Sequence, residues 1–405
     1  MDPQAFEQKI SQNVNFSVPK LRKLKVFQWL FADTRPRYFW SSRRPLTLSL
    51  FDRKISRYLR KLQALQLFTQ TLLSDHLLFS SQIPLHQIQN LALEINSTNL
   101  PVLDFALLSK FSNLESLSLS FRYSGEAYIH DFSFLFNLKK FSFQTCGPII
   151  ASNSLQKNLP KLESLEIKSF GSSCSHLTFY KNLILKAPNI KTLKIFFPAQ
   201  SLPELLEFDF SLAELSLGVP EINAPFIPFS KNLSAFLQKN SNLKSLQLYF
   251  HESYHDFLEP IMRSIQSLKG IESFKLELKR PLELKDCKIP LLSDVVTKLE
   301  GLKSIHLEVP DHIFDSKEVS SLANTLMKCE RLEKLVLNAV FMKISDASFG
   351  KFMEFVRNAK GIKSKDLCIK GCSEEKKKQL EKALGYDISY WEDPFMKIST
   401  DRNSA

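Results

Sequence analysis

Residues 243–250 read LKSLQLYF, and this segment sets the template for most of the chain. Its apolar residues Leu243, Leu246, Leu248 and Phe250 follow the order Leu-x-x-Leu-x-Leu-x-apolar. The last three alternate with polar residues, which is the period of two that lets a β-strand send successive side chains to opposite faces. The segment therefore predicts one short strand with a single buried face.

The same template recurs eleven times, at spacings of 22 to 31 residues. The units begin at Ile88, Leu114, Leu138, Leu162, Ile190, Leu212, Leu243, Ile271, Leu302, Leu332 and Ile362. Apolar residues at helical spacing precede the later strands, as in Val319, Leu322 and Leu326. Strands that each need a helix to cover them stack into one continuous core with parallel strands. The sequence predicts an α/β solenoid, curved, with strands on its concave face and helices and irregular segments on its convex face.

Three segments follow from this pattern. Residues 1–60 are expected to form a basic, aromatic-containing N-terminal cap, and residues 61–372 an array of about 11–12 units. Residues 373–405 are expected to hold a capping helix, a final strand at 388–391 and a polar tail. Ser373 suits the N-cap of that helix, which we place over residues 374–384.

The recurring leucines resemble the leucine-rich-repeat family over residues 88–370. The units of 28–31 residues are similar to its ribonuclease-inhibitor-like class, and that resemblance implies a horseshoe with helices on the outer face. The family's Asn or Cys just after the strand occurs only at Asn96 and Cys146. The resemblance is therefore to a degenerate form that lacks the regular Asn/Cys ladder.

Catalytic motifs are scarce. Residues 251–255 read HESYH, a formal match to the His-Glu-x-x-His motif of zinc proteases. That motif needs both histidines on one helix and a further ligand, whereas this match follows directly on a predicted strand, so we expect an exposed polar loop. Cys368 and Cys372 are interpreted as one core and one turn cysteine. The sequence predicts no enzyme, cofactor or metal site.

The net charge of +12 is concentrated near the N-terminus. Residues 1–60 hold 13 Lys and Arg against 4 Asp and Glu, and aromatic residues such as Trp29 and Trp40 lie among them. This cluster includes Arg43, Arg44, Arg57 and Arg60. Such a mixture binds phosphates and stacks bases, docks on an acidic protein or membrane surface, or simply covers a cap. These alternatives stay open at the level of sequence.

The strand positions that point away from the core define a second candidate surface. Most are small or polar, and larger side chains stand among them at Lys194, Phe196, Tyr249, Lys275 and His306. An aromatic within a polar surround is the usual composition of an interface hot spot. The leading interpretation is a non-enzymatic protein-protein interaction scaffold that uses this concave face and the basic cap. The alternative is a nucleic-acid-associated protein, RNA-binding or ribonucleoprotein, that uses residues 20–60.

Cysteine usage and hydropathy suggest the compartment. The six cysteines lack the Cys-x-x-Cys spacing of zinc and redox sites, and no run of about 18 apolar residues indicates a transmembrane segment. Acids in the first residues argue against a secretory signal. We expect a cytoplasmic protein, with nuclear or cytoskeleton-associated placement and mitochondrial import as alternatives.

Overall fold

A computed structural model describes residues 26–30, 64–69, 85–95, 111–121, 127–129, 137–147, 149–151, 158–169, 177–198, 202–207, 211–220, 226–253, 255–281, 289, 291–341, 344–359 and 361–384. The chain divides into two compact units. The N-terminal unit is Met1–Asn189 and the C-terminal unit is Ile190–Ala405. No helix among the described residues has both the length and the apolar character needed to cross a bilayer.

The N-terminal unit contains a parallel sheet in which the order of strands follows their order in the chain. Its strands are β1 (Val26–Leu30), β2 (Ala64–Thr69), β3 (Asn90–Ile95), β4 (Ser116–Phe121), β6 (Lys140–Thr145) and β8 (Ser164–Ser169). Between them lie a short 3₁₀ helix at Leu85–Gln87 and the two-stranded parallel sheet of β5 (Ala127–Ile129) and β7 (Ile149–Ala151), and helix α4 (Leu177–Leu185) follows β8. β1 lies inside the segment that we expected to form the cap.

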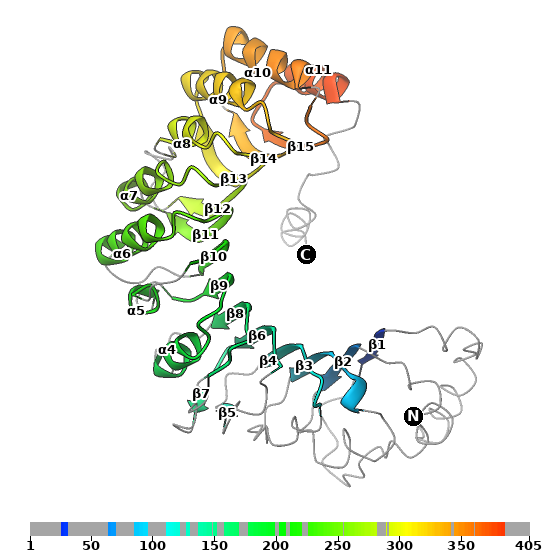
Figure 1. Cartoon of the computed structure of the whole chain (residues 1–405). Helices are drawn as coiled ribbons and strands as arrows, with labels where there is room; N and C mark the ends of the chain where they lie inside the picture. Colours follow the sequence, from blue (N-terminus) through cyan, green and yellow to red (C-terminus); the bar gives the residue numbers. More distant parts are fainter. Residues whose placement is uncertain are drawn as a thin grey trace, which may run out of the picture. The chain divides into compact units, whose positions relative to one another are not determined.

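The C-terminal unit repeats a strand and a helix in regular alternation (Figure 1). Its parallel strands are β9 (Thr192–Phe196), β10 (Glu214–Val219), β11 (Ser245–Ser253), β12 (Ser273–Pro281), β13 (Ser304–Phe314), β14 (Lys334–Phe341) and β15 (Ser364–Lys370). Its helices are α5 (Leu202–Leu205), α6 (Phe226–Lys239), α7 (His255–Ile265), α8 (Leu292–Lys298), α9 (Ser316–Lys328), α10 (Asp346–Asn358) and α11 (Glu374–Leu384). The helix expected over residues 374–384 is present as α11, whereas residues 388–391 lie outside the described residues.

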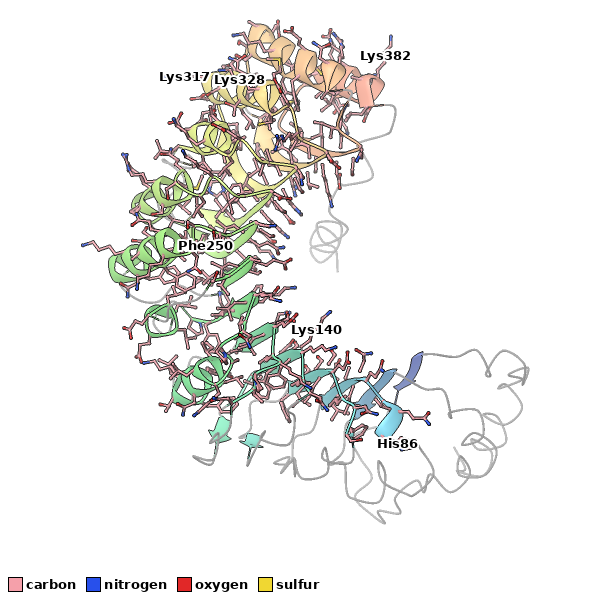
Figure 2. All side chains as sticks on the ribbon, viewed as in Figure 1. His86, Lys140, Phe250, Lys317, Lys328 and Lys382 are labelled. Atoms are coloured by element: carbon pink, nitrogen blue, oxygen red, sulfur yellow. The ribbon has the colours of Figure 1, made fainter. Side chains whose placement is uncertain are left out.

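The core of the C-terminal unit lies between its strands and its helices. Leu246, Leu248 and Phe250 of β11 point into it and are essentially inaccessible to solvent. The Phe250 ring meets Phe257 of α7 edge to face, with centroids 5.0 Å apart, and the side chain of Phe250 lies between the two layers in Figure 2. In-register pairing places Leu215, Leu246, Phe274, Ile305 and Leu335 side by side across successive strands. The alternation read from the sequence is therefore confirmed.

A ladder of alternating charges precedes the strands. The positions before β11 to β15 are Lys244, Glu272, Lys303, Glu333 and Lys363, and we call them the charge ladder. Nζ of Lys303 lies 2.7 Å from Oε2 of Glu272, and Nζ of Lys363 lies 2.7 Å from Oε2 of Glu333. The hydrogen bonds from these lysines hold the pKa of both glutamates below the usual value. Each exposed ion pair contributes little to the free energy of unfolding, so the main effect of the charge ladder is to favour one pairing register between neighbouring strands.

The two units differ at the position just before the first apolar residue of each repeat. In the N-terminal unit, the amides of Asn113, Asn137 and Asn189 donate to carbonyl oxygens in the preceding repeat, at 2.8, 3.1 and 2.7 Å. In the C-terminal unit, glycine occupies this position in three repeats, as Gly270, Gly301 and Gly361, and Ser211, Asn242 and Arg331 occupy it in the others. A Cβ on Gly270 and on Gly301 would lie 3.3 and 3.4 Å from the carbonyl oxygens of Leu243 and Ile271, so glycine lets the backbones approach closely.

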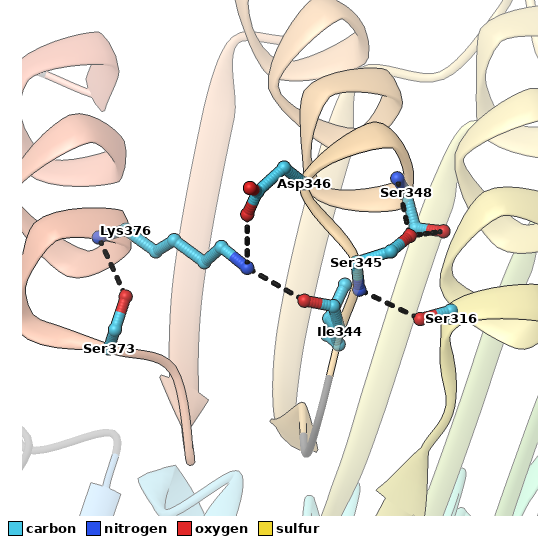
Figure 3. A network of polar contacts seen from close by, with 7 residues as sticks. All are labelled: Ser316, Ile344, Ser345, Asp346, Ser348, Ser373 and Lys376. Atoms are coloured by element: carbon cyan, nitrogen blue, oxygen red, sulfur yellow. Dashed lines mark hydrogen bonds and ion pairs between the residues drawn. The ribbon is translucent and has the colours of Figure 1, made fainter.

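The last two helices are joined by one lysine (Figure 3). Nζ of Lys376 in α11 donates to the carbonyl oxygen of Ile344 at 2.7 Å and pairs with Asp346 at 2.9 Å, just before and at the start of α10. In turn, the backbone amide of Ser345 donates to Oγ of Ser316 in α9, and Ser373 accepts from the amide of Lys376 as the N-cap of α11. α9, α10 and α11 are therefore fixed to one another through their N-terminal ends.

Candidate interaction face

The sheet of the C-terminal unit has one face that its helices leave uncovered (Figure 1). We call it the open face, and it consists of the strand residues that alternate with the core positions. Side by side along one register position lie Lys194, Ser216, Gln247, Lys275, His306, Val336 and Asp366. Two residues further along each strand lie Phe196, Gly218, Tyr249, Glu277, Glu308, Asn338 and Cys368.

Two rings meet on this face although a strand separates them. Phe196 of β9 and Tyr249 of β11 have their ring centroids 6.1 Å apart and their planes inclined by 46°. Gly218 of β10 stands between them, and a Cβ on Gly218 would overlap the Phe196 ring. The absence of a side chain at Gly218 therefore lets Phe196 lie across β10 and reach Tyr249. We call these two residues the aromatic pair.

Charged side chains continue the face beside the aromatic pair. Nζ of Lys279 lies 5.2 Å from the centroid of the Tyr249 ring, within the range of a cation–π interaction. Partial burial acts to lower the pKa of Lys279, but its interactions with Tyr249 and Glu277 outweigh that effect and raise it. Glu277 pairs with Lys275 at 3.1 Å and with Lys279 at 3.8 Å. The lysines are therefore held in place by a glutamate whose side chain is only 14% exposed.

A second acid lies on the next strand. Nε2 of His306 is 3.4 Å from Oε2 of Glu308, two positions along β13. The hydrogen bond from His306 lowers the pKa of Glu308 despite partial burial, and the charges of Lys275 and Lys279 act in the same direction. Glu308 therefore stays ionised at neutral pH and completes a cluster of paired charges next to the aromatic pair.

Two polar atoms border this cluster without a hydrogen bond to any described residue. They are Nδ1 of His251 on β11 and Oδ1 of Asn338 on β14, and both atoms are shielded from solvent. Asn338 pairs in register with Glu308, and His251 follows Tyr249 by two residues. Buried polar atoms usually have a hydrogen-bond partner, so these two acceptor or donor sites are open to a hydrogen bond from outside the described residues.

The structure places the candidate residues from the sequence on two different parts of the chain. Lys194, Phe196, Tyr249, Lys275 and His306 all lie on the open face, and the structure brings Phe196 and Tyr249 into contact. Arg43, Arg44, Arg57 and Arg60 lie outside the described residues, as does most of residues 20–60.

Four residues that shape the face escaped the sequence reasoning. Gly218, Glu277, Lys279 and Glu308 line it together with the predicted residues. Aligning the repeats would have shown Gly218 at an outward strand position between Phe196 and Tyr249. A glycine inside a strand often marks a close approach of other groups, so this alignment could have predicted the contact of the two rings.

The structure corrects our interpretation of residues 251–255 and of Cys368. β11 continues to Ser253 and α7 begins at His255, so the motif is divided between a strand and a helix and is not an exposed loop. His251 is half-buried on the strand. Cys368 is half-buried on the outward side of β15 and not in the core, and burial raises the pKa of its thiol.

The groups that could hold a metal are dispersed. Within the described part of the chain, no three His, Cys, Asp or Glu side chains gather in an arrangement suited to a metal ion. The four described cysteines, Cys146, Cys329, Cys368 and Cys372, are free thiols. The sequence matches no family model and no curated protein.

Proposed function

We propose that this chain is a non-enzymatic protein-protein interaction scaffold of the leucine-rich-repeat type, a curved solenoid that binds its partner on the open face as the concave side. The aromatic contact between Phe196 and Tyr249 across Gly218 carries this proposal. Aromatic anchors within a polar, charged surround provide most of the free energy at protein interfaces. The division of the His-Glu-x-x-His segment between β11 and α7 supports a non-enzymatic role, because a zinc-protease site needs both histidines on one helix.

The basic N-terminal segment has a separate part in the proposal. Residues 1–60 carry a net charge of +9, so we expect them to steer an acidic partner toward the chain. Rim charges chiefly change association rates, whereas a desolvated aromatic anchor chiefly changes dissociation rates. The two surfaces are therefore separable by kinetics. The free thiols support a reducing compartment such as the cytoplasm.

The test uses a partner purified from the native cell and full-length variants. Tyr249→Ala should speed dissociation by tenfold or more, since a hot-spot truncation costs about 2 kcal/mol. Lys334→Ala, an exposed change on β14 of the same face, is the control and should bind like the wild type. Reversing Arg43, Arg44, Arg57 and Arg60 to Glu should slow association and weaken its dependence on salt. Wild-type kinetics in both the Tyr249 and the Arg variants would place the interface elsewhere.

The nucleic-acid alternative makes a different prediction for the same segment. Binding that neutralises several phosphates weakens steeply as salt rises, with a slope set by the number of contacts. A steep slope with an oligonucleotide, lost in the fourfold Arg variant and kept in Tyr249→Ala, would favour this alternative over the scaffold.

A further inference from the structure

The open face carries one row of residues with a lysine at each end. Lys194, Ser216, Gln247 and Lys275 are neighbours in register on β9, β10, β11 and β12. Neighbouring strands lie about 4.8 Å apart, so the two lysine Cα atoms are separated by roughly 14 Å. Ser216 and Gln247 between them carry no charge. We call this set the lysine row.

The aromatic pair lies beside the middle of the lysine row. Phe196 and Tyr249 follow Lys194 and Gln247 by two residues on their strands, which is about 7 Å along a strand. Gly218 occupies the same position on β10, between the two rings. The face therefore presents an aromatic surface of two inclined rings over β9 to β11, with an ammonium group on each side of it.

The charge that a partner meets here is positive. Glu277 is the acid nearest the pair in register, and its side chain is only 14% exposed because Lys275 and Lys279 close over it. Lys275 and Lys279 themselves are 30% and 49% exposed. With Lys194, three lysines surround the aromatic pair, and two carboxylates oppose them, the largely covered Glu277 and Glu308 on the next strand, which His306 pairs.

We infer that this face binds an acidic peptide segment in extended conformation that lies across the strands. One large apolar side chain of the peptide packs on the aromatic pair, and two of its carboxylates pair with Lys194 and Lys275 at the ends of the lysine row. In an extended peptide, residues two apart point to the same side and residues four apart are separated by about 13 Å. The pattern acid-x-apolar-x-acid therefore matches the roughly 14 Å of the lysine row. This inference rests on the proposed function and specifies the chemistry of its partner.

A single-stranded nucleic acid is the competing occupant, because bases stack on rings and lysines contact phosphates. The open face suits it less well. Nucleic-acid grooves follow the backbone with continuous positive charge, whereas Ser216 and Gln247 are neutral and Glu214 and Glu308 border the row. A peptide with two separated carboxylates avoids those glutamates.

The experiment selects ligands from a phage library of random dodecapeptides on the immobilised full-length chain, with Tyr249→Ala in solution to remove peptides that bind elsewhere. We expect the pattern acid-x-apolar-x-acid among the selected peptides. The best peptide is then labelled with fluorescein and measured by anisotropy. Exchanging its two acids for Lys should weaken binding at least tenfold, and exchanging its apolar residue for Ala should do the same.

Charge reversal on the protein provides the matched test. Lys194→Glu combined with Lys275→Glu should invert the preference, so that the Lys-exchanged peptide binds more tightly than the acidic one. Lys334→Glu, an exposed change on β14 of the same face but outside the lysine row, should leave the preference intact. Gly218→Ala should displace Phe196 and weaken the apolar contact fivefold or more. Phe196→Ala tests the same contact if Gly218→Ala lowers the melting temperature.

The outcomes separate this inference from the proposed function. Peptides that bind regardless of their charge, yet lose affinity with Tyr249→Ala, overturn the acidic partner and leave the scaffold standing. Selected peptides that bind Tyr249→Ala as well as the wild type overturn the site itself. A fluorescein-labelled oligothymidylate that binds the open face more tightly than every peptide, and depends on Tyr249, overturns both in favour of nucleic acid.

Discussion

The two units of this chain build similar parallel sheets from repeats of different length. First positions are 24 to 28 residues apart between Ile88 and Ile190; in the C-terminal unit the first step, from Ile190 to Leu212, is 22 residues and the later ones up to Ile362 are 28 to 31. The longer repeats carry helices of up to 14 residues between their strands, whereas the described connections of the N-terminal unit are a 3₁₀ turn, two three-residue strands and, in its 28-residue repeat, the nine-residue helix α4. A repeat that is about four residues longer therefore has room for a helix, whereas the shorter repeats cover the same kind of strand with turns and short strands.

The units also differ in how neighbouring repeats are joined. Asn113, Asn137 and Asn189 of the N-terminal unit use side-chain amides to bind the carbonyl of the repeat before them. Gly270 and Gly301 replace the amide with direct backbone proximity in the C-terminal unit. The same position thus adds a hydrogen bond at these three asparagines and removes bulk at these two glycines.

The largest effect is expected where the helix-backed core is broken. Leu246→Asp would bury a carboxylate at a position with no solvent exposure, which costs several kcal/mol or forces local unfolding. Thermal melting and limited proteolysis should show loss of the repeats around β11, with the N-terminal unit protected longer. Gln247→Asp is the exposed control. Unchanged melting of Leu246→Asp would contradict the assigned register.

A pH effect should be confined to the C-terminal unit. Burial lowers the pKa of His312 on β13 to about 4, so folding favours its neutral form. Above the unfolded pKa of about 6.5, His312 is neutral in both states and costs the folded state nothing. As pH falls from there toward 4, only the unfolded state takes up the proton, so the free energy of unfolding decreases by up to about 3 kcal/mol. Chemical denaturation of His312→Gln should show a shallower loss of stability over that range. His86→Gln, an exposed change in the N-terminal unit, should keep the wild-type slope.

A smaller effect should distinguish the amide joints. Asn137→Ala removes the bond to the carbonyl of Ser112 and the bond from Lys161, so we expect a loss of about 1 kcal/mol. Gly361 occupies the matching position before Ile362, and a Cβ added to it would have no atom within 4 Å. Gly361→Ala should therefore change stability very little. Equal destabilisation by the two changes, measured in urea, would remove the distinction between the units.

The smallest expected effect is a gain. Gly350 lies in the interior of α10 with open space around its Cα, so Gly350→Ala should stabilise the chain by about 0.5–1 kcal/mol. The reason is the lower conformational entropy of alanine in the unfolded chain. A rise in melting temperature that is confined to the C-terminal unit would support the view that its helices distinguish it from the N-terminal unit. A fall would indicate that the added methyl group meets a neighbour at Gly350.

Sequence periodicity predicted the strands well and the surface only in part. Leu246, Leu248 and Phe250 were assignable because burial of alternate residues follows directly from strand geometry. The contact of Phe196 with Tyr249 could not be predicted in this way, because it depends on a third residue, Gly218, on the strand between them. Lys365 interrupts the apolar column, and its Nζ bonds the carbonyl of Val356 near the end of α10. Such contacts between repeats depend on register, which a single unit does not encode.

The charge ladder restricts how this array can gain or lose repeats. Deleting residues 272–302 would place Lys244 beside Lys303, whereas deleting residues 272–332 would place Lys244 beside Glu333 and keep the signs alternating. Like charges side by side are unfavourable by roughly the amount that opposite charges gain. Comparing how salt changes the stability of the two deletions would measure this difference. Duplication and loss in this part of the chain should therefore favour pairs of repeats over single ones.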